Sequence, residues 1–262
     1  MTDPAVLVTG AASGVGRATV MLWTSRGVAV AATDRDEDGL RSLAEEAKTL
    51  RGRLYTLSGD VTSEPEVERI FTEASEELGT IMRVVASGGI EVNAAAHELS
   101  AADWEHVLQA NLTGTFLTCK VAVKAMVDAH VGGSIVCLSS PAAFVGLAGG
   151  GNAAYAASMG GVSALVRSLA VDYAGYGIRV NAVVPGAAET PLLLSGVPEP
   201  DRESSHDDLV ERAVREVPLG RLAKPVEIAQ AVAWLLSDRA SYVTGSHLVC
   251  DGGLLAKSAS TF

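Results

Sequence analysis

Short apolar runs alternate with segments of helical period along the whole chain. The runs are mostly continuous, which is typical of strands that are covered on both faces. They lie at Ala5–Thr9, Val28–Thr33, Leu54–Leu57, Ile81–Ala86, Ser134–Leu138, Ile178–Val184 and His247–Cys250. Helices are predicted between them at Val15–Ser25, Asp36–Leu50, Glu64–Leu78, Asp103–Ala129, Ala153–Tyr173 and Pro225–Leu236. This alternation predicts an α/β fold with a parallel sheet and helices on both of its faces.

The pattern continues without a repeat or a break in composition, so we expect residues 1–262 to form one domain. The stretch Thr190–Leu222 departs from it, because proline, serine and dense charges interrupt the alternation. This stretch is too long for a simple connection. We expect it to form a substrate lid around residues 189–222, with a short helix at Asp207–Arg215.

Charge and cysteine usage narrow the class of protein. A net charge of −11 and a pI near 4.9 argue against nucleic acid or an anionic membrane as a partner. No apolar run reaches the length of a membrane-spanning helix, and Met1–Pro4 lacks the basic region of a signal peptide. The three cysteines lack CxxC spacing, and no His/Asp/Glu cluster has metal-ligand spacing, so no metal is predicted. These features favour a soluble, cytoplasmic protein of enzyme size.

A glycine-rich turn, Thr9–Gly16, joins the first predicted strand to the first predicted helix. Such a turn lets backbone N–H groups approach a pyrophosphate at the positive end of a helix. A tight turn without a ligand is the alternative, but a strand before the turn and a helix after it are the context of a dinucleotide site. The candidate contacts in this turn are Gly10, Ser13, Gly14, Val15 and Gly16.

Asp34 lies at the end of the second strand, eighteen residues after Gly16. A carboxylate there accepts hydrogen bonds from the adenosine ribose hydroxyls and repels a 2′-phosphate. Arg35 follows it and would tolerate that phosphate, while Asp34 could instead be a solvated loop acid or the N-cap of the next helix. We give the carboxylate the larger weight and expect NAD(H) rather than NADP(H) as the cofactor.

Tyr155 and Met159 are four positions apart in the predicted helix Ala153–Tyr173, so they share one helix face. A lysine at the second position would favour the phenolate and lower a phenol pKa that is ordinarily about 10. Methionine carries no charge and donates no hydrogen bond. We therefore expect the pKa of Tyr155 to lie near its ordinary value.

With these residues in view, the chain resembles the short-chain dehydrogenase/reductase family, of the single-domain type, from Val6 to Gly253. The resemblance implies a Rossmann-like, doubly wound sheet of seven parallel strands. It also implies an adenine contact after the third strand and a turn after the sixth strand that holds the nicotinamide. The cofactor contacts that the resemblance adds are Asp60, Val61, Ala86, Ser87, Gly88, Tyr155, Pro185, Gly186, Ala188 and Thr190.

The same resemblance assigns roles to three polar residues. Tyr155 would pass a proton to or from the substrate oxygen, and Ser140 would donate a hydrogen bond to that oxygen. Asn111 matches the asparagine that in relatives helps to hold a water in the proton relay. Ser139 is the alternative to Ser140, Asn111 could bond to nearby backbone instead, and Tyr155 could be a half-buried helix tyrosine.

The sequence departs from the family pattern at two places. The family usually has Asn-Asn-Ala-Gly after the fourth strand, and this chain has Ala86–Gly89 there. Loss of the first asparagine is expected to cost about 1 kcal/mol. Met159 stands where relatives have the lysine that binds the nicotinamide ribose and lowers the tyrosine pKa. Either the site was altered deliberately, or a natural protein performs slow or different chemistry, and both explanations stay open.

The resemblance implies hydride transfer between NAD(H) and a secondary alcohol, diol or ketone. Loss of the lysine is expected to slow this reaction by about 10²–10⁴-fold. An NAD(H)-binding pseudoenzyme is the alternative, and non-redox chemistry at the same site is a third hypothesis. Small and apolar walls at Gly89–Asn93 and Pro141–Asn152 favour a neutral, fairly hydrophobic substrate. In relatives the two long helices pair subunits, so we expect a homotetramer, with a dimer as the alternative.

Overall fold

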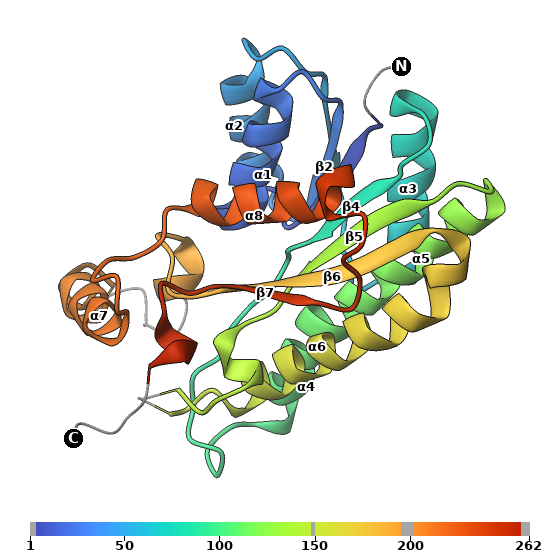
Figure 1. Cartoon of the computed structure of the whole chain (residues 1–262). Coiled ribbons are helices and arrows are strands. Elements are labelled where there is room, and N and C mark those ends of the chain that lie inside the picture. Colours follow the sequence, from blue (N-terminus) through green and yellow to red (C-terminus); the bar gives the residue numbers. More distant parts are fainter. Residues whose placement is uncertain (1–3, 148–149, 195–201, 258–262) are drawn as a thin grey trace.

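Seven strands form one parallel sheet, as the apolar runs predict (Figure 1). The structure is a computed structural model that describes residues 4–147, 150–194 and 202–257. The strands are β1 (Val6–Thr9), β2 (Val30–Asp34), β3 (Leu54–Ser58), β4 (Arg83–Ala86), β5 (Gly133–Leu138), β6 (Ile178–Pro185) and β7 (His247–Cys250). They lie in the order β3-β2-β1-β4-β5-β6-β7. The predicted Rossmann-like, doubly wound sheet is confirmed.

Helices cover both faces of the sheet (Figure 1). On one face lie α1 (Gly14–Ser25), α2 (Glu37–Ala47) and α8 (Pro225–Leu236). On the other face lie α3 (Glu64–Leu78), α4 (Ala101–Leu108), α5 (Gly114–Asp128) and α6 (Ala153–Tyr173). A further helix, α7 (Arg202–Glu216), lies outside both layers.

The central strand β1 explains why the apolar runs are continuous. Leu7 packs into the core beneath α3, α5 and α6, whereas Val6 and Val8 pack into the core beneath α1 and α8. All three side chains are fully buried. A strand covered on both faces has no solvent side, so its sequence does not alternate between apolar and polar residues.

The long helix predicted at Asp103–Ala129 is not one regular helix. It begins at Ala101, where the Ser100 hydroxyl accepts a hydrogen bond from the Asp103 N–H (3.0 Å). A π-helical turn, Gln109–Thr113, then separates α4 from α5. Such turns are frequent at functional sites. Periodicity predicts the helix but does not reveal this turn, because one extra residue in a turn leaves the apolar pattern nearly unchanged.

Two other sequence expectations need adjustment. Helix α7 spans Arg202–Glu216 and is longer than the predicted Asp207–Arg215, while residues 195–201 of the predicted lid lie outside the described residues. The segment Ala153–Tyr176, which contains α6, is long and apolar enough to cross a membrane, contrary to our expectation that no run has that length. Half of its most apolar window is buried within the fold, which is the packing of a core helix.

Candidate active site

The carboxyl ends of β1 to β6 meet at one edge of the sheet, and a cavity of about 480 Å³ lies there. The strand order reverses beside β1, because the chain runs from β1 outward to β3 and then returns to the other side as β4. In open α/β sheets, ligands bind outside the carboxyl ends of the strands at such a switch point.

The glycine turn between β1 and α1 leaves no room for a side chain at Gly10 or Gly16. A Cβ atom on Gly10, whose φ is +64°, would lie 2.5 Å from the Gly88 nitrogen, and one on Gly16 would lie 2.0 Å from the Gly10 oxygen. The Ser13 hydroxyl does not cap α1, and the first turn of α1 carries no acidic residue. An anion is therefore the natural partner for the N–H groups at this helix end, which fits a dinucleotide pyrophosphate.

Asp34 is held in place by backbone N–H groups on both sides. One carboxylate oxygen accepts a hydrogen bond from the Ala12 nitrogen (3.0 Å), and the other accepts one from the Asp36 nitrogen (3.1 Å). It is Asp36 that caps α2, by accepting a hydrogen bond from the Gly39 nitrogen (2.9 Å). The N-cap alternative for Asp34 is therefore wrong. Asp34 lines the cavity together with Arg35.

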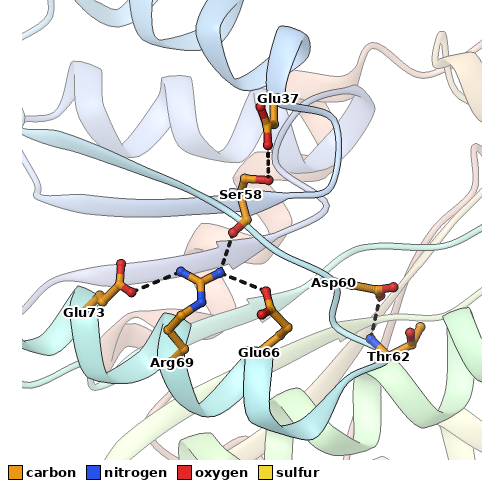
Figure 2. Close-up of polar contacts among 7 residues, drawn as sticks. All are labelled: Glu37, Ser58, Asp60, Thr62, Glu66, Arg69 and Glu73. Atoms are coloured by element: carbon orange, nitrogen blue, oxygen red, sulfur yellow. Dashed lines mark hydrogen bonds and ion pairs between the residues drawn. The ribbon is translucent and has the colours of Figure 1, made fainter.

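The turn after β3 brings Asp60 and Val61 to the cavity. Figure 2 shows how this turn is fixed: the Arg69 guanidinium of α3 donates a hydrogen bond to the Ser58 carbonyl (2.6 Å) and pairs with two carboxylates of its own helix. The Asp60 carboxylate accepts a hydrogen bond from the Thr62 nitrogen (2.9 Å). The turn therefore keeps its shape through its own polar contacts, and Val61 offers the cavity an apolar surface.

Ser87 makes hydrogen bonds between β4 and β1 at the place where the family usually has asparagine. Its hydroxyl donates to the Thr9 carbonyl (2.8 Å), and its N–H donates to the Thr9 hydroxyl (3.3 Å). Ser87 stands at the second asparagine of the family pattern, whereas the expected loss of stability concerns the first, where Ala86 stands, so that loss stays a prediction. Ala86 is buried in β4 and does not line the cavity, in contrast to its predicted role as a cofactor contact.

Two serines follow β5, and their hydroxyls have different partners. The Ser139 hydroxyl bonds to the Ser163 hydroxyl of α6 (2.8 Å), which joins strand and helix. The Ser140 hydroxyl accepts a hydrogen bond from the Ala142 nitrogen (3.2 Å), and it lies close enough to the Tyr155 phenol to act on the pKa of that phenol. Both serines line the cavity, and Ser140 is the one that lies close to the phenol. Its catalytic role stays a prediction.

The phenol of Tyr155 lies in an apolar setting. Tyr155, Met159 and Ala142 form one buried cluster, against which Leu147 and Ala156 pack. Burial raises the pKa of Tyr155 to about 12, although the nearby Ser140 hydroxyl acts to lower it. Our expectation of a pKa near the ordinary value is therefore wrong. Met159 supplies apolar contact and no charge at this place, and an apolar surrounding disfavours the phenolate.

Asn111 lies in the π-helical turn, is fully buried and does not line the cavity. Its amide nitrogen donates to the Ile90 carbonyl (2.9 Å) and to the Ser158 hydroxyl of α6 (3.0 Å). Its amide oxygen accepts a hydrogen bond from the Ile90 nitrogen (2.8 Å). The alternative of bonding to nearby backbone is wrong for this side chain, because its backbone partner is 21 residues away. The side chain ties the segment after β4 to α6.

Most residues that the sequence predicted for the site line this one cavity. The ones that do so are Gly10, Ser13, Gly14, Val15, Gly16, Asp34, Asp60, Val61, Ser87, Gly88, Ser140, Tyr155, Met159, Pro185, Gly186, Ala188 and Thr190. Sequence reasoning missed Glu91 as a charged wall residue and Leu254 as an apolar one. The position of Glu91 just after the β4 loop was a usable signal, whereas nothing local indicates that Leu254 folds back to the site. Within the described residues, no group of three or more His, Cys, Asp or Glu side chains is placed to hold a metal ion.

Comparisons with known proteins agree with this fold. A family model described as enoyl-(acyl carrier protein) reductase matches residues 10–255. A cis-4-hydroxycyclohexanecarboxylate dehydrogenase of Sinomonas cyclohexanicum is 43% identical over 251 residues, which cover 95% of this chain and 96% of that protein. A short-chain type dehydrogenase/reductase of Mycobacterium marinum has a TM-score of 0.90 and 31% identity, covering 98% of this chain and 97% of that one. An actinorhodin polyketide ketoreductase solved with NADPH has a TM-score of 0.88 and 32% identity, covering 97% of this chain and 99% of that one.

The chain belongs to the short-chain dehydrogenase/reductase family. Its similarity to dehydrogenases and reductases over nearly the whole chain makes it an oxidoreductase of that family. The family and the neighbour solved with NADPH indicate a nicotinamide cofactor.

Proposed function

We propose that this short-chain dehydrogenase/reductase is an NAD(H)-dependent enzyme that interconverts secondary alcohols and ketones, with ketone reduction favoured near neutral pH. The observation that carries the proposal is that Ser140 and Tyr155 lie close together in the cavity that also contains the glycine turn and Asp34. A proton donor and a hydrogen-bond donor for one substrate oxygen thus share a cavity with a dinucleotide site.

The residues present fit a nicotinamide dinucleotide. The glycine turn and the N-terminus of α1 would hold the pyrophosphate, and Asp34 would accept hydrogen bonds from the adenosine ribose. Both Asp34 oxygens already accept backbone N–H groups, so the carboxylate is oriented in advance and would repel a 2′-phosphate. This supports NAD(H) over NADP(H). When bound, the nicotinamide supplies hydride to a carbonyl carbon or accepts it from an alcohol carbon.

Side chains of the protein transfer the proton that accompanies the hydride. In reduction, Tyr155 donates its hydroxyl proton to the substrate oxygen while Ser140 donates a hydrogen bond to that oxygen. In oxidation, the phenolate must accept the alcohol proton, and with a pKa of about 12 only about 10⁻⁵ of the molecules hold a phenolate at pH 7. The neutral phenol is thus the form ready for use, which is why reduction is the favoured direction.

Binding and turnover test this proposal in two steps. Titration of the protein with NADH and with NADPH, followed by nicotinamide fluorescence, should give tighter binding of NADH. Assays over a panel of ketones at pH 7 should then show NADH consumption, and the matching alcohols with NAD⁺ should react faster as the pH rises. Absence of NADH binding, or of turnover on every ketone, would reject the enzyme proposal.

A binding-only role is the second candidate, and the apolar surroundings of Tyr155 favour it. A phenol with a raised pKa and no neighbouring cation is a poor base, so a protein of this kind could hold NAD(H) without turnover. NADH binding without turnover on any substrate, in both the native protein and Met159→Lys, would favour this candidate over the enzyme.

We further propose a cytoplasmic homotetramer that is one domain with a lid around residues 189–222. Exposed apolar side chains on α4 and α5, Trp104 and Phe116, support subunit contacts on that face. Pro191–Leu193, which line the cavity, support the lid. Sedimentation equilibrium tests the assembly: a mass of four chains supports it, and a monomer rejects it.

A further inference from the structure

Glu91 is the charged side chain in the part of the cavity wall near Tyr155. It follows the β4 loop, lines the cavity together with Tyr155, Ser140 and Met159, and is partly buried. Its position is fixed through its neighbour, because Asn111 bonds to both the nitrogen and the carbonyl of Ile90. The backbone that carries the Glu91 carboxylate is therefore held in place by the hydrogen bonds of its neighbour.

Among the residues that the structure describes, no cation pairs with this carboxylate. It forms no hydrogen bond or ion pair within the described part of the chain. Of the described residues that line the cavity, the basic one is Arg35, which stands beside Asp34. Burial raises the pKa of Glu91, and its charge in turn raises the pKa of Tyr155. A partly buried, unbalanced carboxylate is best satisfied by a cation.

We propose that the cavity takes an alcohol or ketone that carries a protonated aliphatic amine, and that the Glu91 carboxylate binds the ammonium group. The sequence expectation of a neutral substrate included Glu91 in the wall Gly89–Asn93 but described that wall as small and apolar and did not consider the charge of Glu91. The ammonium would also bring a positive charge close to Tyr155, where relatives have the lysine that Met159 replaces. The substrate itself then supplies part of the missing charge.

The substrate class rests on the proposed function, but the binding of an ammonium group does not. Three compounds provide a matched probe set: 2-amino-1-phenylethanol, its analogue with a hydroxyl in place of the amine, and its analogue with a methyl there. They differ in one terminal group. Each is titrated calorimetrically into the protein saturated with NADH, and its oxidation with NAD⁺ is assayed. The variants are Glu91→Gln, which keeps the side-chain size and removes the charge, and Glu98→Gln, an exposed glutamate of the same segment.

The native protein and Glu98→Gln should bind the amino alcohol about ten- to a hundredfold more tightly than the methyl analogue, the scale of a charge-assisted hydrogen bond. Glu91→Gln should lose that preference. Equal affinities in the native protein, or a preference that survives in Glu91→Gln, would overturn the inference. So would a Glu91→Gln variant that changes only the ratio of NAD⁺ to NADH affinity, since this would assign the carboxylate to the cofactor.

The two proposals fail in different ways. Amine preference in binding without turnover on any substrate would leave Glu91 as an ammonium site and reject the enzyme. Turnover of ketones without amine preference would keep the enzyme and reject the ammonium site.

Discussion

The two ends of the cavity differ in how completely their polar groups are prepared for a ligand. At the adenosine end, Asp34 accepts two backbone N–H groups, and the glycine turn presents an uncapped helix terminus. At the other end, where we propose proton transfer, Tyr155 lies against Met159 and Ala142, with Ser140 and the Glu91 carboxylate nearby. The first end presents groups that bind charged parts of a ligand, whereas the second end disfavours the negative phenolate of Tyr155.

This difference separates binding from chemistry within one cavity. Cofactor binding at the end formed by the glycine turn and Asp34, the adenosine end, needs only groups that are already oriented. A methionine at position 159 therefore leaves this binding unaffected. Alcohol oxidation needs a negative phenolate in a site where burial and Glu91 both oppose that charge. The chain should therefore bind its cofactor normally and be limited at the proton step.

Removing the Tyr155 hydroxyl should lower turnover and leave cofactor affinity unchanged. Tyr155→Phe should lower ketone-reduction turnover by about 10²–10⁴-fold, the usual contribution of a positioned acid. NADH affinity should stay within about twofold, because the hydroxyl is not part of the adenosine contacts. Steady-state kinetics and NADH titration measure the two quantities. Tyr176→Phe, an exposed tyrosine, is the control and should change neither. Equal loss of NADH binding and turnover would mean that the two ends are not separable.

Neutralising Asp34 should alter the other end alone. Asp34→Asn keeps an oxygen for the Ala12 nitrogen and removes the charge that repels a 2′-phosphate. The preference for NADH over NADPH should fall roughly tenfold, the scale of one charge–charge contact near a protein surface. Turnover at saturating cofactor should change little. Competition binding measures the preference, and Asp38→Asn, an exposed acid on α2, is the matched control. An unchanged preference would remove Asp34 from cofactor selection.

Removing the Ser87 hydroxyl should weaken the sheet edge between the two ends. Ser87→Ala loses the hydrogen bond to the Thr9 carbonyl, and the free energy of unfolding should fall by about 1 kcal/mol. Urea denaturation measures it. Ser168→Ala, whose hydroxyl makes an exposed bond, should change it by less than about 0.5 kcal/mol. Equal values for the two variants would show that Ser87 does not join β1 and β4 energetically.

The sequence predicts what local rules determine. A buried parallel sheet requires continuous apolar runs, and a phosphate turn requires glycine at Gly10 and Gly16, so the fold and the adenosine end follow from short segments. Asp34 follows as well, because its position at a strand end is a local property. From the sequence, only the family resemblance favours Ser140 over Ser139. The structure adds that the Ser139 hydroxyl bonds to Ser163 of α6 and so joins strand and helix.

What the sequence leaves out depends on contacts between distant segments. The partners of Asn111 are Ile90 and Ser158, 21 and 47 residues away, and no local pattern connects them. The raised pKa of Tyr155 comes from burial, which requires the packed structure. Glu91 lay within a segment predicted to form the pocket, but its lack of a counter-charge appears only when the surrounding side chains are in place.

The central claim is that Met159 limits the proton step, and Met159→Lys tests it most directly. The lysine should lower the pKa of Tyr155, so alcohol oxidation near pH 7 should rise by about 10²–10⁴-fold. The pH–rate profile for oxidation, which in the native protein should climb toward pH 12, should shift to lower pH. Met159→Leu, which adds no charge, should leave rate and profile unchanged. If Met159→Lys also left the oxidation rate and its pH profile unchanged, the methionine would not be what limits proton transfer.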